Sequence, residues 1–162
     1  MDTLSHALWG KGLFGYKSYK RYAILFGAIP DLLSFGLYFL FNLIINFNNF
    51  EFGKPEIGTI PNWVFDLYNF SHSILTALLF ILIMYFMNKD FCFPMLAWPF
   101  HIMLDFFTHG IEYFPTPILW PISDYKFDGI PWSNPWIWYS NIVCIIFLFL
   151  YRYIQIKNIN EN

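Results

Sequence analysis

Four long apolar stretches constrain the fold of this chain more than any other feature of its sequence. They run from Tyr22 to Phe47, from Ser73 to Met87, from Phe91 to Phe107 and from Trp136 to Ile154. A helix of roughly 20 apolar residues crosses the hydrocarbon core of a bilayer, and 57% of this chain is hydrophobic while 12% is charged. We therefore predict an all-α integral membrane bundle with about four transmembrane helices, formed as a single domain over residues 1–162.

The segment before the first apolar stretch is expected to form a further, short helix. Asp2 or Thr3 can cap a helix that runs to Phe14, although Gly10 and Gly12 weaken its helical propensity. We predict an interfacial or partly re-entrant element. The first residues lack the basic and apolar regions of a secretory signal, so they are expected to stay on the mature chain.

Lysine and arginine residues predict the orientation of the bundle. Four spans would give one side two of these residues, Lys54 and Lys126, and the other side seven: Lys11, Lys17, Lys20, Arg21, Lys89, Arg152 and Lys157. The positive-inside rule then assigns both termini to the cytoplasm. The net charge is -2, and no basic stripe is present of the kind that binds phosphate backbones. We predict the lipid bilayer as a partner and no binding of nucleic acid.

The segment from His101 to His109 holds three possible metal ligands at positions i, i+4 and i+8: His101, Asp105 and His109. At helical pitch four residues rotate by about 40°, so all three fall within roughly 80° of the helix surface. Gly110 is expected to be the C-cap, with His109 in the last turn. Imidazole and carboxylate groups on one face suit zinc or a similar divalent ion. The alternative is a hydrogen-bonded cluster that packs helices together.

Asp31 lies inside the first apolar stretch, directly after Pro30. An unpaired aspartate at mid-depth in a bilayer costs about 3 kcal/mol on insertion scales, so a compensating partner is expected. In the alternative, Pro30 breaks the helix and Asp31 caps a shorter helix that starts at Leu32. At about 1.5 Å per residue, Asp31 lies about 14 Å into its helix and His101 about 15 Å into another, so the two can be level.

The remaining two histidines also lie beside polar groups at the edges of apolar segments. Ser71 is expected to cap the helix of the second stretch, with His72 in its first turn. Hydrolysis by a serine nucleophile is not favoured, because adjacent helical residues do not face each other. His6 lies in the N-terminal segment and joins the others only if that segment re-enters the membrane. Taken together, the four histidines favour one shared site.

A stiff aromatic loop follows His109 and runs from Phe114 to Gly129, with prolines at positions 115, 117 and 121 and a carboxylate at Asp124. It is expected either to roof a cavity or to act as an interfacial anchor.

These motifs, taken in order along nearly the whole chain, resemble those of the YdjM-type family of predicted membrane-bound metal-dependent hydrolases. The matching residues are Met-Asp-Thr-Leu-Ser-His6, Pro30-Asp31, Ser71-His72-Ser73, His101-x3-Asp105-x2-Thr-His109 and Pro-Ile-Ser-Asp124. The pattern is also similar, more distantly, to the zinc-dependent phospholipase C and nuclease superfamily. Some family members carry His-Arg where this chain has Leu67-Tyr68, so we expect one or two metal ions.

The resemblance implies a metal-dependent hydrolase of the bacterial inner membrane. The expected metal ligands, for zinc or another divalent ion, are His6, Asp31, His72, His101, Asp105 and His109. Metal-activated water would attack a phosphoester or ester, such as a lipid, with Asp105 or Asp31 as the catalytic general base. Two other classes stay open: transport of protons or metal ions through the membrane, and a non-enzymatic membrane scaffold whose polar cluster ties helices together.

Overall fold

The fold was taken from a computed structural model, which describes residues 1–45, 47 and 53–161. Throughout these residues the regular elements are helices, without a strand, which confirms the prediction of an all-α fold. The main helices are α1 (Thr3–Phe14), α2 (Tyr22–Asp31), α3 (Leu37–Ile45), α4 (Asn62–Ser71), α5 (Ile74–Met87), α6 (Cys92–Met95), α7 (Ala97–Thr108) and α8 (Pro135–Glu161). Short elements are η1 (Leu32–Gly36), η3 (Ile57–Thr59) and η4 (Lys89–Phe91).

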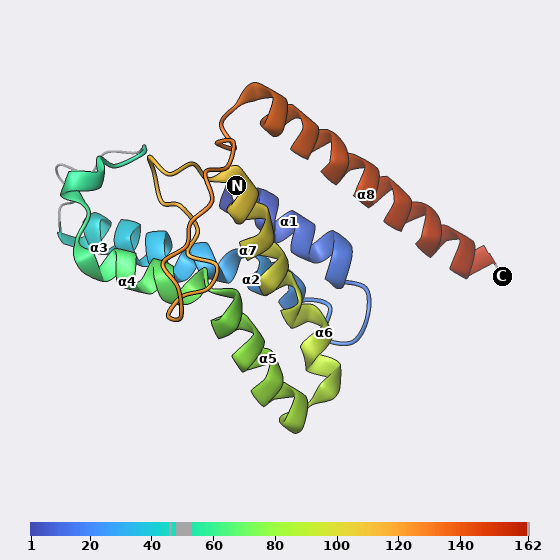
Figure 1. Ribbon diagram of the computed structural model, residues 1–162. Helices are drawn as coiled ribbons and strands as arrows, with labels where there is room; N and C mark the ends of the chain where they lie inside the picture. The colour runs from blue at the N-terminus through green and yellow to red at the C-terminus, as the bar shows by residue number, and fades with distance from the viewer. Residues whose placement is uncertain (46, 48–52, 162) are drawn as a thin grey trace.

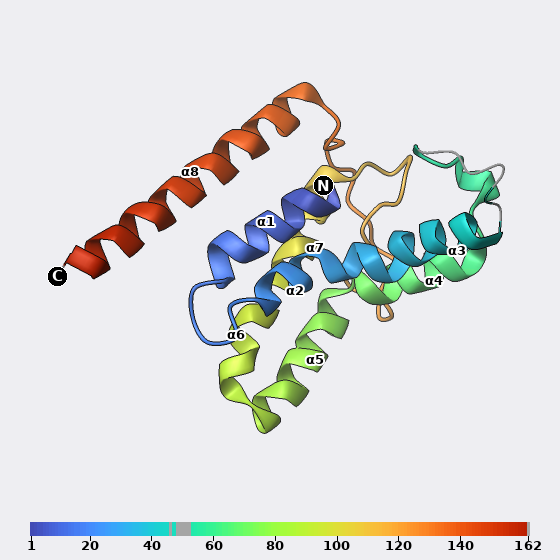
Figure 2. The same ribbon diagram turned by 180° about the vertical axis from the view of Figure 1, so that it is seen from behind.

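The helices gather around α1, α2 and α7, which contact one another (Figure 1). Helices α3 and α4 lie side by side on one flank, and the long helix α8 lies on the opposite flank, as both views show (Figure 2). Three helical stretches are long and apolar enough to cross a membrane: Tyr22–Ile45, Lys89–Thr108 and Pro135–Asn158. Helices α4 and α5 meet the same test only as a pair, bent by 55° at the break between them.

The first span runs past Pro30 without ending, so the alternative in which Asp31 caps a new helix is wrong. Asp31 has helical dihedral angles, φ -66° and ψ -43°, and its side chain makes no capping hydrogen bond. A π-helical segment, Leu32–Gly36, follows directly. The Pro30 carbonyl accepts hydrogen bonds from the hydroxyls of Ser34 (3.1 Å) and Ser71 (3.0 Å). The wider turn therefore lets the helix continue, while side chains take up the carbonyl.

The chain between the first two predicted apolar stretches includes a helix that the sequence analysis did not predict, α4. Buried Val64, Tyr68 and Ser71 recur at helical spacing and form the face that α4 packs inward. Ser71 is therefore the last residue of α4 rather than a cap. The N-cap of α5 is Ser73, whose hydroxyl accepts from the backbone N–H of Thr76. The result is that His72 lies in the break between two helices instead of in a first turn.

Helix α7 ends at Thr108, so the prediction of a Gly110 C-cap is wrong. His109 is extended, with φ -114° and ψ 133°, and follows the helix instead of completing its last turn. The backbone N–H groups of Gly129, Ile130 and Trp132 donate to the carbonyls of residues 109, 107 and 108 at 2.9–3.1 Å. This distant segment satisfies the carbonyls that a glycine cap would otherwise have served.

Helix α1 begins as predicted, with Asp2 as the N-cap that accepts from the backbone N–H of Ser5 at 2.8 Å. Its glycines allow it to lie directly against α2. A methyl group on Gly10 would lie 2.4 Å from the carbonyl oxygen of Ala23, and one on Gly27 would lie 2.4 Å from that of His6. The absence of side chains at these two positions therefore allows the His6 backbone to lie next to α2.

Helix α8 is bound to α1 by polar contacts at two levels. The indole of Trp9 donates to the Asn141 amide oxygen at 2.7 Å, and the Arg152 guanidinium donates to the Gly12 carbonyl at 2.8 Å. Its span is only 11% buried within the described structure, so most of its apolar surface faces outward.

The contact between α1 and α2 gives a test of this packing. Replacing Gly27→Ala forces a methyl group against the His6 carbonyl, so we expect a loss of about 1–3 kcal/mol in the free energy of unfolding. The loss can be measured by unfolding of the purified chain in detergent micelles. Gly58→Ala is the matched control, because a methyl group there meets no described atom within 4 Å. Equal stability of the two variants would contradict the close helix approach.

Candidate metal centre

Two helices and the break between two others bring two carboxylates and two imidazoles into one buried group. We call it the four-residue cluster: Asp31, His72, His101 and Asp105. Asp31 ends α2, His72 lies in the break between α4 and α5, and the other two lie one turn apart on α7. One ligand atom from each residue lies within 4.8 Å of all the others. The four-residue cluster can therefore hold a metal ion.

The separations between these ligand atoms fit a small divalent ion. His101 Nε2 lies 3.2 Å from His72 Nε2 and 3.1 Å from Asp105 Oδ2. His72 Nε2 lies 3.5 Å from Asp105 Oδ2. Asp31 Oδ1 lies 3.5 Å from His72 Nε2 and 3.7 Å from His101 Nε2. Tetrahedral zinc with bonds of about 2.0–2.2 Å separates its ligand atoms by about 3.3–3.6 Å. The five separations bracket that range.

The hydrogen bonds of the two imidazoles determine which nitrogen carries the lone pair. His101 Nδ1 donates to the Gly27 carbonyl at 2.7 Å. His72 Nδ1 lies 3.2 Å from the Tyr68 carbonyl and 3.0 Å from the Ser71 hydroxyl, whose own proton is directed to the Pro30 carbonyl, so both neighbours accept from Nδ1. A carbonyl oxygen only accepts, so in each neutral ring the proton is on Nδ1 and the lone pair on Nε2. Two lone pairs that face each other at 3.2 Å repel. A cation between them removes the repulsion and meets the arrangement usual for ligating histidines.

The carboxylate of Asp105 gives a second, independent indication. Its side chain is fully buried. Oδ1 accepts from His6 Nε2 at 2.8 Å and contacts the Met1 amino group. Oδ2, which faces the two imidazoles, has no hydrogen-bond partner among the described residues. A buried oxygen without a partner costs about 1–3 kcal/mol, so the orientation of Oδ2 favours a cation in the cluster.

Asp31 is held by the first residue of α1. The Thr3 hydroxyl donates to Asp31 Oδ2 at 2.7 Å, which leaves Oδ1 toward the two imidazoles. The partner that the sequence led us to expect for this carboxylate is thus supplied partly by α1. Thr3 itself was considered only as a possible helix cap.

The structure also brings His6 and His109 to the edge of the cluster. His6 is buried, and its ring stacks on that of His101 with centroids 3.5 Å apart. His109 Nε2 lies 3.7 Å from Asp105 Oδ1, although His109 has left the helix. All six residues expected as ligands therefore lie in one group, with His6 and His109 on the Oδ1 side of Asp105.

His109 lies just beyond the apolar span that ends at Thr108. Burial lowers the pKa of its imidazole to about 4, although the nearby Asp105 carboxylate acts in the opposite direction. The ring is therefore neutral at neutral pH, which is the form of histidine that binds metal ions.

The aromatic loop covers one side of this group. Phe114 and Thr116 are buried, and the Tyr68 hydroxyl donates to the Phe114 carbonyl at 2.8 Å. Ser73 donates its hydroxyl to the carbonyl of Trp120. Asp124 is exposed, and in the described part of the chain no contact joins it to the four-residue cluster. The loop thus packs against α4 and the start of α5, and its own carboxylate lies outside the site.

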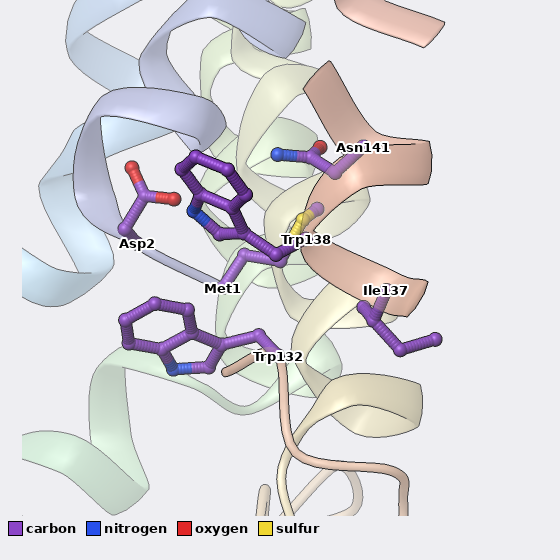
Figure 3. A pocket seen from close by; sticks show the side chains of 6 residues that line it. All are labelled: Met1, Asp2, Trp132, Ile137, Trp138 and Asn141. Carbon is purple, nitrogen blue, oxygen red and sulfur yellow. The ribbon is translucent and has the colours of Figure 1, made fainter. Parts of the chain in front are cut away.

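A shallow recess of about 140 Å³ opens beside the chain end whose amino group contacts Asp105. Figure 3 labels the side chains that line it: Met1, Asp2, Trp132, Ile137, Trp138 and Asn141. Aromatic and aliphatic groups from α8 and the loop before it therefore form most of the lining of this recess.

Sequence reasoning missed the groups that orient the ligands. These are the Gly27 carbonyl, the Thr3 hydroxyl and both the carbonyl and the hydroxyl of Tyr68. The spacing of Tyr68 four residues before His72 was the one available signal, and it became informative only once α4 was known to be a helix.

No family model, no curated protein sequence and no solved structure matches this chain. The likeness to YdjM-type proteins therefore rests on the order and spacing of the motifs alone.

Proposed function

We propose that this chain is a membrane-bound, metal-dependent hydrolase of the YdjM type, with zinc as its metal. The observation that carries the proposal is the pair of Nε2 atoms of His72 and His101, which face each other at 3.2 Å with both lone pairs directed inward. Imidazole and carboxylate ligands in a dry site suit zinc better than magnesium or calcium, which prefer oxygen ligands.

Within the four-residue cluster we assign the metal to His72, His101 and Asp105 and leave Asp31 as the general base. Three protein ligands with a fourth position open are typical of catalytic zinc. Asp31 Oδ1 has the longest of the five separations given above, 3.7 Å from His101 Nε2. Its side chain is also 11% exposed, whereas that of Asp105 is fully buried.

A divalent ion bound here supplies activated water and polarises a phosphoryl or acyl oxygen. Asp31 would accept the proton of the attacking water at Oδ1, while the Thr3 hydroxyl holds Oδ2. Asp105 would anchor His6 through Oδ1. If a second ion is bound, His6 would give up its hydrogen bond to Oδ1 and keep its proton on Nδ1, and His6, His109 and that same oxygen would then hold the ion.

The proposed setting is the bacterial inner membrane, with four spans if the bent pair α4 and α5 counts as one. Contacts at one end of the bundle favour a cytoplasmic placement of that end, which holds the C-terminus, whereas Met1 lies at the other end beside the start of α8 (Figure 1). The Arg152 guanidinium lies 3.9 Å from the Tyr16 ring centroid, and Lys17 Nζ lies 4.4 Å from that of Phe93. Cations over aromatic rings are typical of a membrane interface. An ester that resides in the bilayer, such as a phospholipid, would suit this setting.

Metal content of the detergent-purified chain tests the site. We expect about one zinc ion or more per chain by elemental analysis, and a loss of at least about tenfold in metal affinity in His101→Ala and Asp105→Ala. Asp124→Ala is the matched control, because it removes an exposed carboxylate of the same chemistry. A wild-type chain that binds no metal after reconstitution with zinc would overturn the proposal.

Replacing Asp31→Asn separates metal binding from turnover. The variant is expected to keep its metal and to lose about 10²–10⁴-fold in kcat, because a general base has been removed, whereas Asp105→Asn loses the metal itself. Hydrolysis of phospholipid vesicles and of an aryl phosphodiester, before and after a chelator, supplies the readout. Metal or proton flux into liposomes without any hydrolysis would assign the cluster to transport.

A further inference from the structure

Tyr68 contacts two histidines of the site through three different parts of its structure. It lies on α4, one turn before the break, and is 2% exposed. Its carbonyl accepts from His72 Nδ1 at 3.2 Å, and its ring stacks on the His72 imidazole with centroids 3.9 Å apart and planes at 21°. Its hydroxyl lies 3.0 Å from His109 Nδ1. No other described residue outside the ligands joins both histidines in this way.

The direction of the hydroxyl bond follows from its other partner. The Tyr68 hydroxyl is 2.8 Å from the Phe114 carbonyl, which can only accept, so the single phenolic proton is directed there. The lone pair of the phenolic oxygen is then left for His109, whose Nδ1 must carry a proton in order to donate. Thr116 Oγ1, at 3.5 Å, is the one further polar neighbour of the hydroxyl.

We propose that Tyr68 is a positioning residue that fixes the tautomer of His109, with the lone pair on Nε2. That nitrogen lies 3.7 Å from Asp105 Oδ1. Together with the carbonyls that hold His72 and His101, the hydroxyl gives three imidazoles the same tautomer, each with Nε2 toward a carboxylate of the site. The inference rests on the proposed metal site for its purpose, but the tautomer itself is a property of the metal-free chain.

Removal of the hydroxyl has a specific consequence. In Tyr68→Phe the aromatic ring and the backbone carbonyl stay, so His72 keeps its stacking partner and its acceptor. His109 Nδ1 loses its acceptor, and protonation at Nε2 becomes favoured because Asp105 Oδ1 can accept from it. The lone pair would then point away from the site, and His109 would no longer serve as a ligand.

The test uses the full chain, metal-free in detergent micelles and labelled with ¹⁵N-histidine, in long-range ¹H–¹⁵N correlation spectra that distinguish the two tautomers. We expect wild-type His109 to carry its proton on Nδ1 and Tyr68→Phe to move it to Nε2, with the His72 signals unchanged as an internal reference. The His109 ring signals are assigned as those that disappear from the spectrum of the His109→Gln variant. Tyr113→Phe, which removes a hydroxyl that donates to the Pro55 carbonyl at 3.0 Å, is the matched control and should change neither histidine.

Zinc affinity at the second position, which includes His109 and Asp105 Oδ1, gives a second readout, with an expected loss of about 10–100-fold in Tyr68→Phe and none in Tyr113→Phe. A wild-type His109 protonated at Nε2, or a tautomer unaffected by Tyr68→Phe, overturns the proposal. The wild-type spectrum decides which nitrogen of His109 is protonated even if the Tyr68→Phe variant does not fold. A wild-type chain with the expected tautomers that binds no zinc supports the role of Tyr68 and overturns the metallohydrolase instead.

Discussion

The buried carboxylate of Asp105 is the group on which the rest of the site depends. Its two oxygens divide the surrounding imidazoles, with His72 and His101 facing Oδ2 and His6 and His109 facing Oδ1. A charge taken out of water is strongly destabilising unless opposite charge or hydrogen-bond donors surround it. Because α7 alone cannot surround Asp105, the fold must bring α1 and the break between α4 and α5 to it.

Three of the site residues lie where a helix departs from regular geometry. Asp31 precedes a π-helical segment, His72 lies between two helices, and His109 follows the end of α7. Irregular backbone frees carbonyl groups, which are costly in an apolar environment unless they are bonded. Here the freed groups have a use, since the Tyr68 carbonyl orients His72 and the Pro30 carbonyl accepts two serine hydroxyls. The irregular segments that interrupt regular helical hydrogen bonding therefore also orient the ligands.

Gly27 links the packing of the bundle to the chemistry of the site. Its lack of a side chain allows the His6 backbone to approach α2, and its carbonyl fixes the tautomer of His101. The ring of His6 then stacks on that of His101. Gly27 thus positions two imidazoles. It leaves room for the backbone of His6, and its carbonyl accepts a hydrogen bond from His101.

The sequence by itself determined the all-α class and the pairing of His101 with Asp105, because apolar runs and a spacing of four residues act through local helical pitch. It did not determine the bend at His72, the continuous helix past Pro30 or the extended backbone of His109, since each depends on hydrogen bonds from distant segments such as residues 129–132. The convergence of His6, Asp31 and His72 on α7 was decided only by tertiary packing. Local spacing fixes which residues share a helix face, whereas the meeting of faces depends on contacts between residues far apart in the chain.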